Sequence, residues 1–338
     1  MAPLPSEMVR YADGATEFTV LRLTDPTHTS LLPAYYGRAL SRRGNFLLYS
    51  NDRTGQFQAY RMDLKSGQSK QLTTAQRLET ATVTLLPDEK SCCFVADGAV
   101  AQLQLSNERQ HEVYRIPEGL ESGKGFSVSD DGMFAALVEK KAGLYRLRLL
   151  NIARGLASTV TEGPDELSDP AIRPKRAGIL YRRGEGELHV VNFDGGQNQK
   201  LRTAPGGTGP ALWSQDGRNV DYLSFPEERK VLNGIREYTP DSNEDRFVAP
   251  TTQYVHFGRN ADASVFVGAS GSKASPYLLL LVRSVKRELT LCEHKASDPS
   301  MVAPIFSPNS QRVFFQTDRH GKPAIYSMAV ERLVEATE

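Results

Sequence analysis

The chain has 338 residues, and its 41 Lys and Arg against 40 Asp and Glu leave a formal net charge of +1. This balance does not indicate a broad basic face, so we expect no nucleic-acid partner. With 39% hydrophobic and 24% charged residues, the composition is typical of a folded globular protein and excludes a disordered or fibrous chain.

Three further features bear on location. The longest apolar run, residues 277–282, is far too short to span a bilayer, and we expect no membrane association. The first residues lack the basic and apolar regions of a secretory signal. The three cysteines, Cys92, Cys93 and Cys292, are not the even, spaced set of a disulfide framework. Together these features predict a cytoplasmic protein with reduced cysteines.

Taken in chain order, the sequence predicts an N-terminal extension over residues 1–15, followed by a strand within residues 17–24. That segment resembles residues 69–73 and 199–203, which end later repeats. Short strands and polar turns then fill the chain to residue 330, with no long helical periodicity among them. We expect residues 331–338 to form a C-terminal tail.

The predicted strands belong to a repeat. Residues 39–55 and 305–321 read almost alike, each with a strand, a polar turn, a second strand and an Asp-Arg-x-Gly turn. Fainter copies lie between them, each with one apolar residue before its polar turn. These apolar residues are Leu40, Leu86, Val128, Ile172, Trp213, Phe257 and Phe306. Their spacings of 46, 42, 44, 41, 44 and 49 are typical of propeller blades.

Seven copies predict an all-β fold, a single seven-bladed β-propeller over residues 16–330. The seventh copy ends before a fourth strand. We expect residues 17–24 to supply that strand by pairing with the last blade. This N-terminal strand would close the ring and remove an exposed sheet edge.

Motifs of the common enzyme classes are absent from the sequence. No Gly-x-Ser-x-Gly elbow of an α/β-hydrolase occurs. The six His never fall within metal-motif spacing, and no Cys pair suits zinc. Only a central channel could assemble a metal site, by bringing together residues of distant blades.

Five short segments carry a family resemblance. They are Leu-Thr-Asp-Pro at 23–26, Tyr-Tyr at 35–36, Leu-Leu-Tyr at 47–49, Trp-Ser-Gln-Asp-Gly at 213–217 and Phe-Ser-Pro-Asn at 306–309. Over nearly the full chain, the sequence resembles the intracellular oligogalacturonate lyases, seven-bladed propellers related to the TolB-like propellers. The resemblance implies pectin degradation by β-elimination, in which a proton next to a uronate carboxylate is removed and the glycosidic oxygen leaves.

The same resemblance implies a metal, usually manganese held by three His and one Gln, which acts as a Lewis acid. The family's Gln-x-x-His-x-His stretch aligns with Asp298, Met301 and Ala303, and its remaining His falls on Gly209 or Pro210. A lone carboxylate does not make a transition-metal site. We therefore predict no metal and no cofactor, and the sequence leaves open whether the chain is an active lyase.

Two residues are candidates for catalysis. His256 stands where the family also has His, and Arg183 neighbours the position of the family's catalytic arginine. The candidates for substrate binding are Tyr35, Tyr36, Arg38, Arg173 and Asp298. Arginine forks suit a uronate carboxylate. The alternatives are a structural histidine for His256 and solvated strand ends or ion pairs between blades for the others.

Three functions are compatible with these observations, because a propeller fold does not itself determine function. The first is a lyase-like propeller that eliminates without a metal. The second is a non-catalytic propeller that binds an acidic oligosaccharide in its central channel. The third is a scaffold whose rim contacts a protein partner. A channel lined by arginine and aromatic residues would favour the sugar, and a large apolar rim patch the protein.

Overall fold

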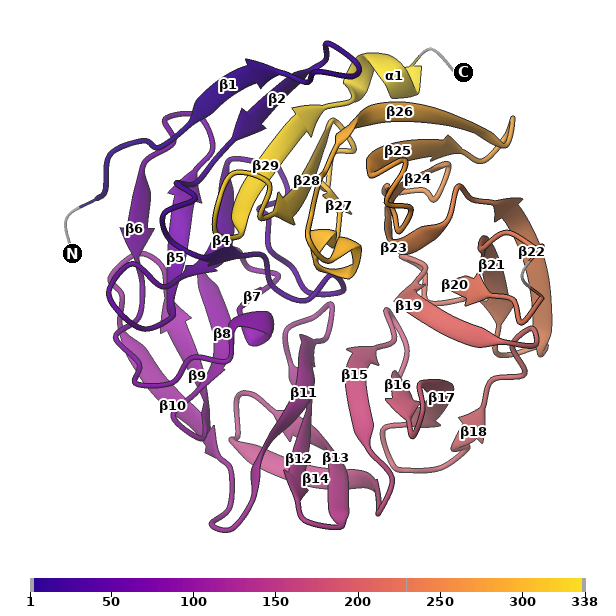
Figure 1. Ribbon diagram of the computed structural model, residues 1–338. Coiled ribbons are helices and arrows are strands. Elements are labelled where there is room, and N and C mark those ends of the chain that lie inside the picture. Colours follow the sequence, from indigo (N-terminus) through magenta and orange to yellow (C-terminus); the bar gives the residue numbers. More distant parts are fainter. Residues whose placement is uncertain (1–2, 229, 336–338) are drawn as a thin grey trace.

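The computed structural model describes residues 3–228 and 230–335 (Figure 1). The strands form six hydrogen-bonded sheets arranged around a ring. The all-β propeller fold predicted from the repeat is therefore confirmed. Within the described residues, no helix has both the length and the apolar character that crossing a membrane requires.

Four of the sheets contain four antiparallel strands each. The first two are β3 (Ser30–Leu31), β4 (Phe46–Asn51), β5 (Gln58–Asp63) and β6 (Ser69–Gln71), then β7 (Thr84–Leu85), β8 (Ser91–Ala96), β9 (Ala99–Gln104) and β10 (Gln110–Arg115). The other two are β19 (Gly207–Trp213), β20 (Val220–Phe225), β21 (Gly234–Thr239) and β22 (Glu244–Pro250), then β23 (Tyr254–Arg259), β24 (Val265–Ser270), β25 (Tyr277–Val282) and β26 (Arg287–Glu293). In Figure 1 the first strand of these sheets, such as β7, β19 and β23, lies nearest the centre.

The next sheet has eight strands. They are β11 (Glu121–Val128), β12 (Phe134–Lys141), β13 (Leu144–Asn151), β14 (Leu156–Gly163), β15 (Leu167–Ile172), β16 (Gly178–Arg183), β17 (Glu187–Asn192) and β18 (Gln199–Lys200). The first four and the last four strands are antiparallel among themselves, and β11 joins β15 in parallel at Lys124 and Ser168. This single pair fuses two repeats, so the structure has six sheets instead of the seven separate ones expected.

The remaining sheet has five strands and joins both ends of the chain. In order across the sheet they are β1 (Val9–Ala12), β2 (Thr19–Arg22), β29 (Ala324–Ala329), β28 (Arg312–Thr317) and β27 (Ile305–Phe306). β2 pairs with β29 through Leu21 and Ser327, the pairing expected for residues 17–24. β1 lies inside the segment expected to be an extension, and it adds an outer strand to the sheet. Short helices η1 (Thr80–Thr82), η2 (Pro299–Val302) and α1 (Glu331–Glu335) complete the fold.

The polar turns of the repeat share one geometry. Backbone N–H groups of Gly44, Gly132, Gly217 and Ser310 each donate to the carbonyl three residues earlier, at 2.8 to 3.0 Å. All four residues have positive φ, between 60° and 74°. Glycine adopts this conformation without a steric penalty, which explains its recurrence in these turns.

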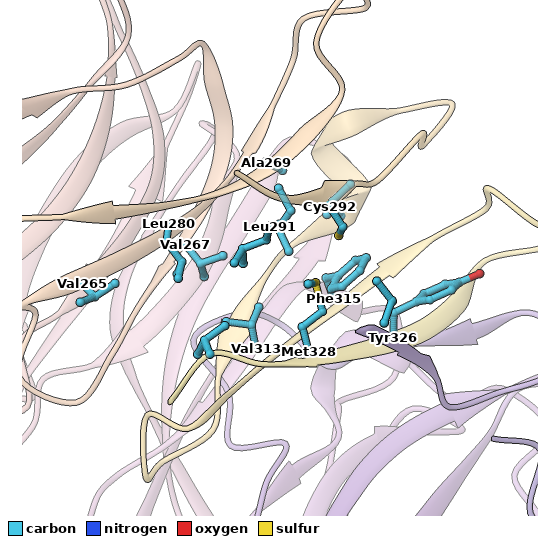
Figure 2. Close-up of a cluster of buried hydrophobic side chains, with 14 of the residues drawn as sticks. Val265, Val267, Ala269, Leu280, Leu291, Cys292, Val313, Phe315, Tyr326 and Met328 are labelled. Atoms are coloured by element: carbon cyan, nitrogen blue, oxygen red, sulfur yellow. The ribbon is translucent and has the colours of Figure 1, made fainter. Parts of the chain in front are cut away.

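The core lies between neighbouring sheets. The second strand of most sheets is buried on both faces, and β4 and β24 are buried at every residue. Such strands read as continuous apolar runs, because sheets cover them on both sides. Figure 2 shows one of these layers, in which Val267 and Leu280 face Val313, Phe315 and Met328 of the sheet that joins the termini.

Candidate functional site

A loop from the first sheet reaches across the ring. It follows β3 and carries Tyr35 and Tyr36, which we call the tyrosine bridge. Two contacts fix its start, since Leu32 N–H donates to Gln316 Oε1 at 2.7 Å and Ala34 N–H to the Ala81 carbonyl at 3.0 Å. Its two rings meet edge to face, with centroids 5.0 Å apart.

Tyr35 connects the loop to strands on the other side of the ring. Its hydroxyl oxygen accepts a hydrogen bond from the Ala211 N–H of β19 at 3.1 Å. Its ring also meets the His256 ring of β23 edge to face, with centroids 4.8 Å apart. The bridge therefore connects the loop after β3 with β19 and β23.

Tyr36 contacts a partly buried ion pair. Its hydroxyl hydrogen-bonds the side chain of Asp169, and the Asp169 carboxylate lies 3.3 Å from Arg182 Nε. The other Arg182 nitrogens donate to the carbonyls of Gly186, Thr208 and Gly209. Burial raises the pKa of Asp169, while Arg182 opposes that rise. With its donors engaged by the backbone, Arg182 holds two sheets together.

Burial of the tyrosine bridge has a chemical consequence. It raises the pKa of both Tyr35 and Tyr36. Both hydroxyls therefore keep their protons at neutral pH. A protonated hydroxyl can donate its proton to a leaving oxygen, but it is a poor base for removing a proton from a substrate.

His256 lies close to the bridge but is shielded. Its side chain is 7% exposed, and Nδ1 has no hydrogen-bond partner among the described residues. Burial lowers its pKa to about 4, so the ring is neutral at pH 7. The structure thus brings the catalytic candidate His256 beside Tyr35, yet leaves it out of the cavity described below.

An open cavity of about 480 Å³ lies on the side of the bridge where the polar turns gather. We call it the turn-side cavity. Its polar and aromatic lining includes Tyr35, Tyr36, Arg38, Arg42, Glu89, Asp130, Trp213, Gln215, Arg259 and Phe306. Apolar lining comes from Leu40, Leu85, Leu86, Leu212 and Ile305. The size and the mixture of apolar walls with a few charged groups are typical of small-molecule sites.

Two arginines of this cavity are paired with acids. Arg38 Nη2 donates to Asp130, and both side chains are partly exposed. Arg259 is buried, with Nη1 3.4 Å from Asp221 and Nη2 donating to the Trp213 carbonyl at 2.6 Å. Burial raises the pKa of Asp221 to about 6, although Arg259 opposes this effect. Sequence reasoning missed Arg259, although it lies only two residues after the repeat position Phe257.

The other predicted site residues have structural partners elsewhere. Arg183 pairs with Asp165 at 2.9 Å. Arg173 stacks on Trp213 at 4.9 Å and pairs with Asp241 at 3.0 Å. The Arg173–Asp241 pair joins two sheets, whereas the Arg183–Asp165 pair lies within one four-strand unit. Of the substrate-binding candidates, the turn-side cavity brings together Tyr35, Tyr36 and Arg38, whereas Arg173 and Asp298 do not line it.

The positions aligned with the family's metal ligands do not fit a manganese ion. Asp298 caps η2 by accepting from Ser300 N–H at 2.9 Å. Met301 offers its carbonyl to Gln316 Nε2 at 2.7 Å, and Ala303 carries no donor side chain. Across residues 3–228 and 230–335, no three His, Cys, Asp or Glu side chains are grouped as a metal site requires.

Comparisons with known proteins found similarity to oligogalacturonate lyases. A family model described as oligogalacturonate lyase matches residues 3–148. The chain is 23% identical to the oligogalacturonide lyase of Pectobacterium atrosepticum, with 96% of each chain covered. It is 22% identical to the oligogalacturonate lyase of Dickeya dadantii, with 94% of each covered.

Solved structures give the same result for the fold. An oligogalacturonate lyase in complex with manganese superposes with a TM-score of 0.92 at 22% identity, covering 99% of both chains. The oligogalacturonate lyase of Vibrio parahaemolyticus gives 0.89 at 22% identity, covering 97% of this chain and 98% of that one. TolB of Acinetobacter baumannii, 12% identical, gives 0.50 over 85% of this chain and 78% of its own.

Proposed function

We propose that this chain, a distant relative of the oligogalacturonate lyase family, acts on short galacturonides by β-elimination. The observation that supports this proposal is the likeness along almost the entire chain, at 22 to 23% identity, to proteins with this activity in their names. The cationic and aromatic lining of the turn-side cavity is consistent with an acidic sugar.

β-Elimination requires a cation beside the uronate carboxylate, a base, and an acid for the leaving oxygen. Arg38 supplies a guanidinium in the turn-side cavity. The candidate acids are the hydroxyls of Tyr35 and Tyr36, which are hydrogen-bonded to Ala211 and Asp169 outside that cavity. His256 is a neutral base at pH 7, but Tyr35 shields it. In this scheme the bridge must move before His256 can reach a substrate.

A second function, galacturonide binding without cleavage, is favoured by one specific observation. Met301 and Ala303 stand where the family's alignment places metal-binding histidines, and the described residues form no other metal cluster. Loss of the Lewis acid removes several kcal/mol of stabilisation from the transition state. Binding depends on the arginines and aromatic walls, which the loss does not affect.

The deciding experiment follows the ultraviolet absorbance of the unsaturated product when the purified protein is mixed with digalacturonate. A rise in the presence of a chelator would establish elimination without a metal. A rise only with added manganese would show that ligands other than those aligned here bind the ion. Constant absorbance both with chelator and with manganese, together with measurable digalacturonate binding, would establish the second function.

We also propose that the six sheets form a seven-bladed ring over residues 16–330. The eight-stranded sheet supports this count, because it divides into two antiparallel four-strand units at the pair of Lys124 and Ser168. The pairing of β2 with β29 supports closure by the N-terminal strand. A crystal structure showing that strand detached from β29 would contradict the closure.

A further inference from the structure

The turn-side cavity is not lined by the positions aligned with the family's metal ligands. Its lining includes Ser307 and Pro308, which follow β27 in the chain. Residues 298–303, which precede β27, do not line it. Any ligand in this cavity is therefore bound by residues that the metal alignment does not include.

Arg38 is the group best placed to receive an anion. One guanidinium nitrogen, Nη2, pairs with Asp130, while Nη1 is buried and has no hydrogen-bond partner among the described residues. The Asp130 side chain is 48% exposed, so water can solvate its carboxylate when the pair opens. Arg38 can thus exchange one carboxylate for another while the local charge stays balanced.

A second cation, Arg42, lines the same cavity. The Arg42 side chain is exposed and forms no ion pair with the described residues, although its backbone N–H donates to Glu89. The wall nearby is apolar and includes Leu86 and Phe306. An anion with an apolar face, such as the C–H face of a sugar ring, matches this combination.

We propose that the turn-side cavity binds a uronate, whose carboxylate replaces Asp130 on Arg38 and is attracted by Arg42. The choice of a uronate among small carboxylates rests on the proposed function. Asp130 then acts as an internal competitor, occupying Arg38 until the ligand arrives. Two parallel N–H···O bonds to a carboxylate make Arg38 the main determinant of affinity.

Calorimetric titration of the full chain with D-galacturonate and with D-galactose tests the proposal, because these sugars differ in one carboxylate. We expect galacturonate to bind and galactose not to bind. Arg38→Gln should weaken galacturonate binding about ten-fold or more, and Arg42→Gln about two- to three-fold. Asp130→Asn should strengthen it several-fold, since the competing charge is removed. Equal binding of both sugars, or no binding of either, would overturn the proposal.

Arg43→Gln is the matched control, because Arg43 is an exposed neighbour of Arg42 that does not line the cavity. It should leave the affinity for galacturonate unchanged. Circular dichroism and the midpoint of thermal unfolding would show that each variant is folded. A variant Asp130→Asn that is folded and binds less tightly than the wild type would also contradict the exchange.

The test separates this site from the proposed function. Galacturonate is a monosaccharide without a glycosidic bond, so its binding does not depend on elimination. Product formation from digalacturonate without galacturonate binding would overturn the cavity site and retain the lyase. Galacturonate binding that Arg38→Gln abolishes, with no turnover or binding of digalacturonate, would retain the site and overturn the proposed function.

Discussion

Two arginines close to the tyrosine bridge, Arg182 and Arg38, differ in what they bind. Arg182 is only 13% exposed, and its nitrogens donate to three backbone carbonyls and approach Asp169. Arg38 has one exposed partner, Asp130, and an open cavity beside it. A guanidinium fixed by backbone carbonyls contributes to stability, whereas one held by a single exposed acid remains available to a ligand.

The largest effect should come from Arg182→Met. It leaves three backbone carbonyls without a donor and removes one cation from Asp169, whose side chain is 37% exposed, so we expect a loss of about 3 kcal/mol in the free energy of unfolding, mainly from the carbonyls. Urea unfolding measures it. Arg183→Met is the control, because its exposed pair with Asp165 should contribute less than about 1 kcal/mol. Equal losses of unfolding free energy in both variants would mean that Arg182 contributes no more to stability than an exposed ion pair.

The next effect concerns pH and His256. Its pKa is about 4 in the folded chain against 6.5 in the unfolded one, so the unfolded chain binds the proton more strongly. Its contribution to stability is fully present above pH 6.5 and disappears as the pH falls towards 4. The loss is at most about 3 kcal/mol. Unfolding measured between pH 4 and 7 should show a smaller decline with falling pH in His256→Gln than in the wild type.

Asp221 acts in the opposite direction in the same range, because burial raises its pKa to about 6. It is present in both proteins, so the difference between them still isolates the histidine. Identical pH profiles would mean that the ring is exposed to water in solution. That result would also contradict the interpretation that Tyr35 keeps His256 away from solvent.

A smaller effect is expected from Tyr35→Phe. The substitution removes the acceptor of the Ala211 N–H and keeps the ring against His256, so stability should fall by about 1 to 2 kcal/mol. Thermal unfolding would detect it. If Tyr35 also donates the proton in elimination, the rate of digalacturonate turnover should fall much more than the stability does.

The smallest change in stability is expected from Arg38→Gln. Its pair with Asp130 is partly exposed, and such pairs contribute less than about 1 kcal/mol. Urea unfolding should therefore give nearly the wild-type value, although the same variant loses galacturonate affinity. A loss as large as that of Arg182→Met would mean that both arginines serve the fold.

Much of the fold could be predicted because each repeat carries its own turn chemistry and apolar strands. The period predicted a propeller, and the likeness of residues 17–24 to last strands predicted the pairing with β29. The fusion of two sheets could not be predicted, because it depends on where β11 and β15 meet in space. β1 was missed because its four residues are mostly exposed and have no apolar pattern.

The site was predicted less completely. Tyr35, Tyr36 and Arg38 were found from their place before a polar turn, and the cavity contains all three. Arg173 also lies at a polar turn, directly after the repeat position Ile172, but it pairs with Asp241 and does not line the cavity. Asp169 was missed. Its positive φ of 50° directly before a proline marks an unusual backbone, but that angle is visible only in the structure.

The pairing of β2 with β29 also affects how the protein is made. Leu21 leaves the ribosome early, but its partner Ser327 is synthesised more than 300 residues later. Until then β2 has no partner in β29, and contacts so distant in sequence form slowly. The five-stranded sheet can therefore assemble only after β29 has been synthesised, and a shorter nascent chain leaves an unpaired strand edge open to aggregation.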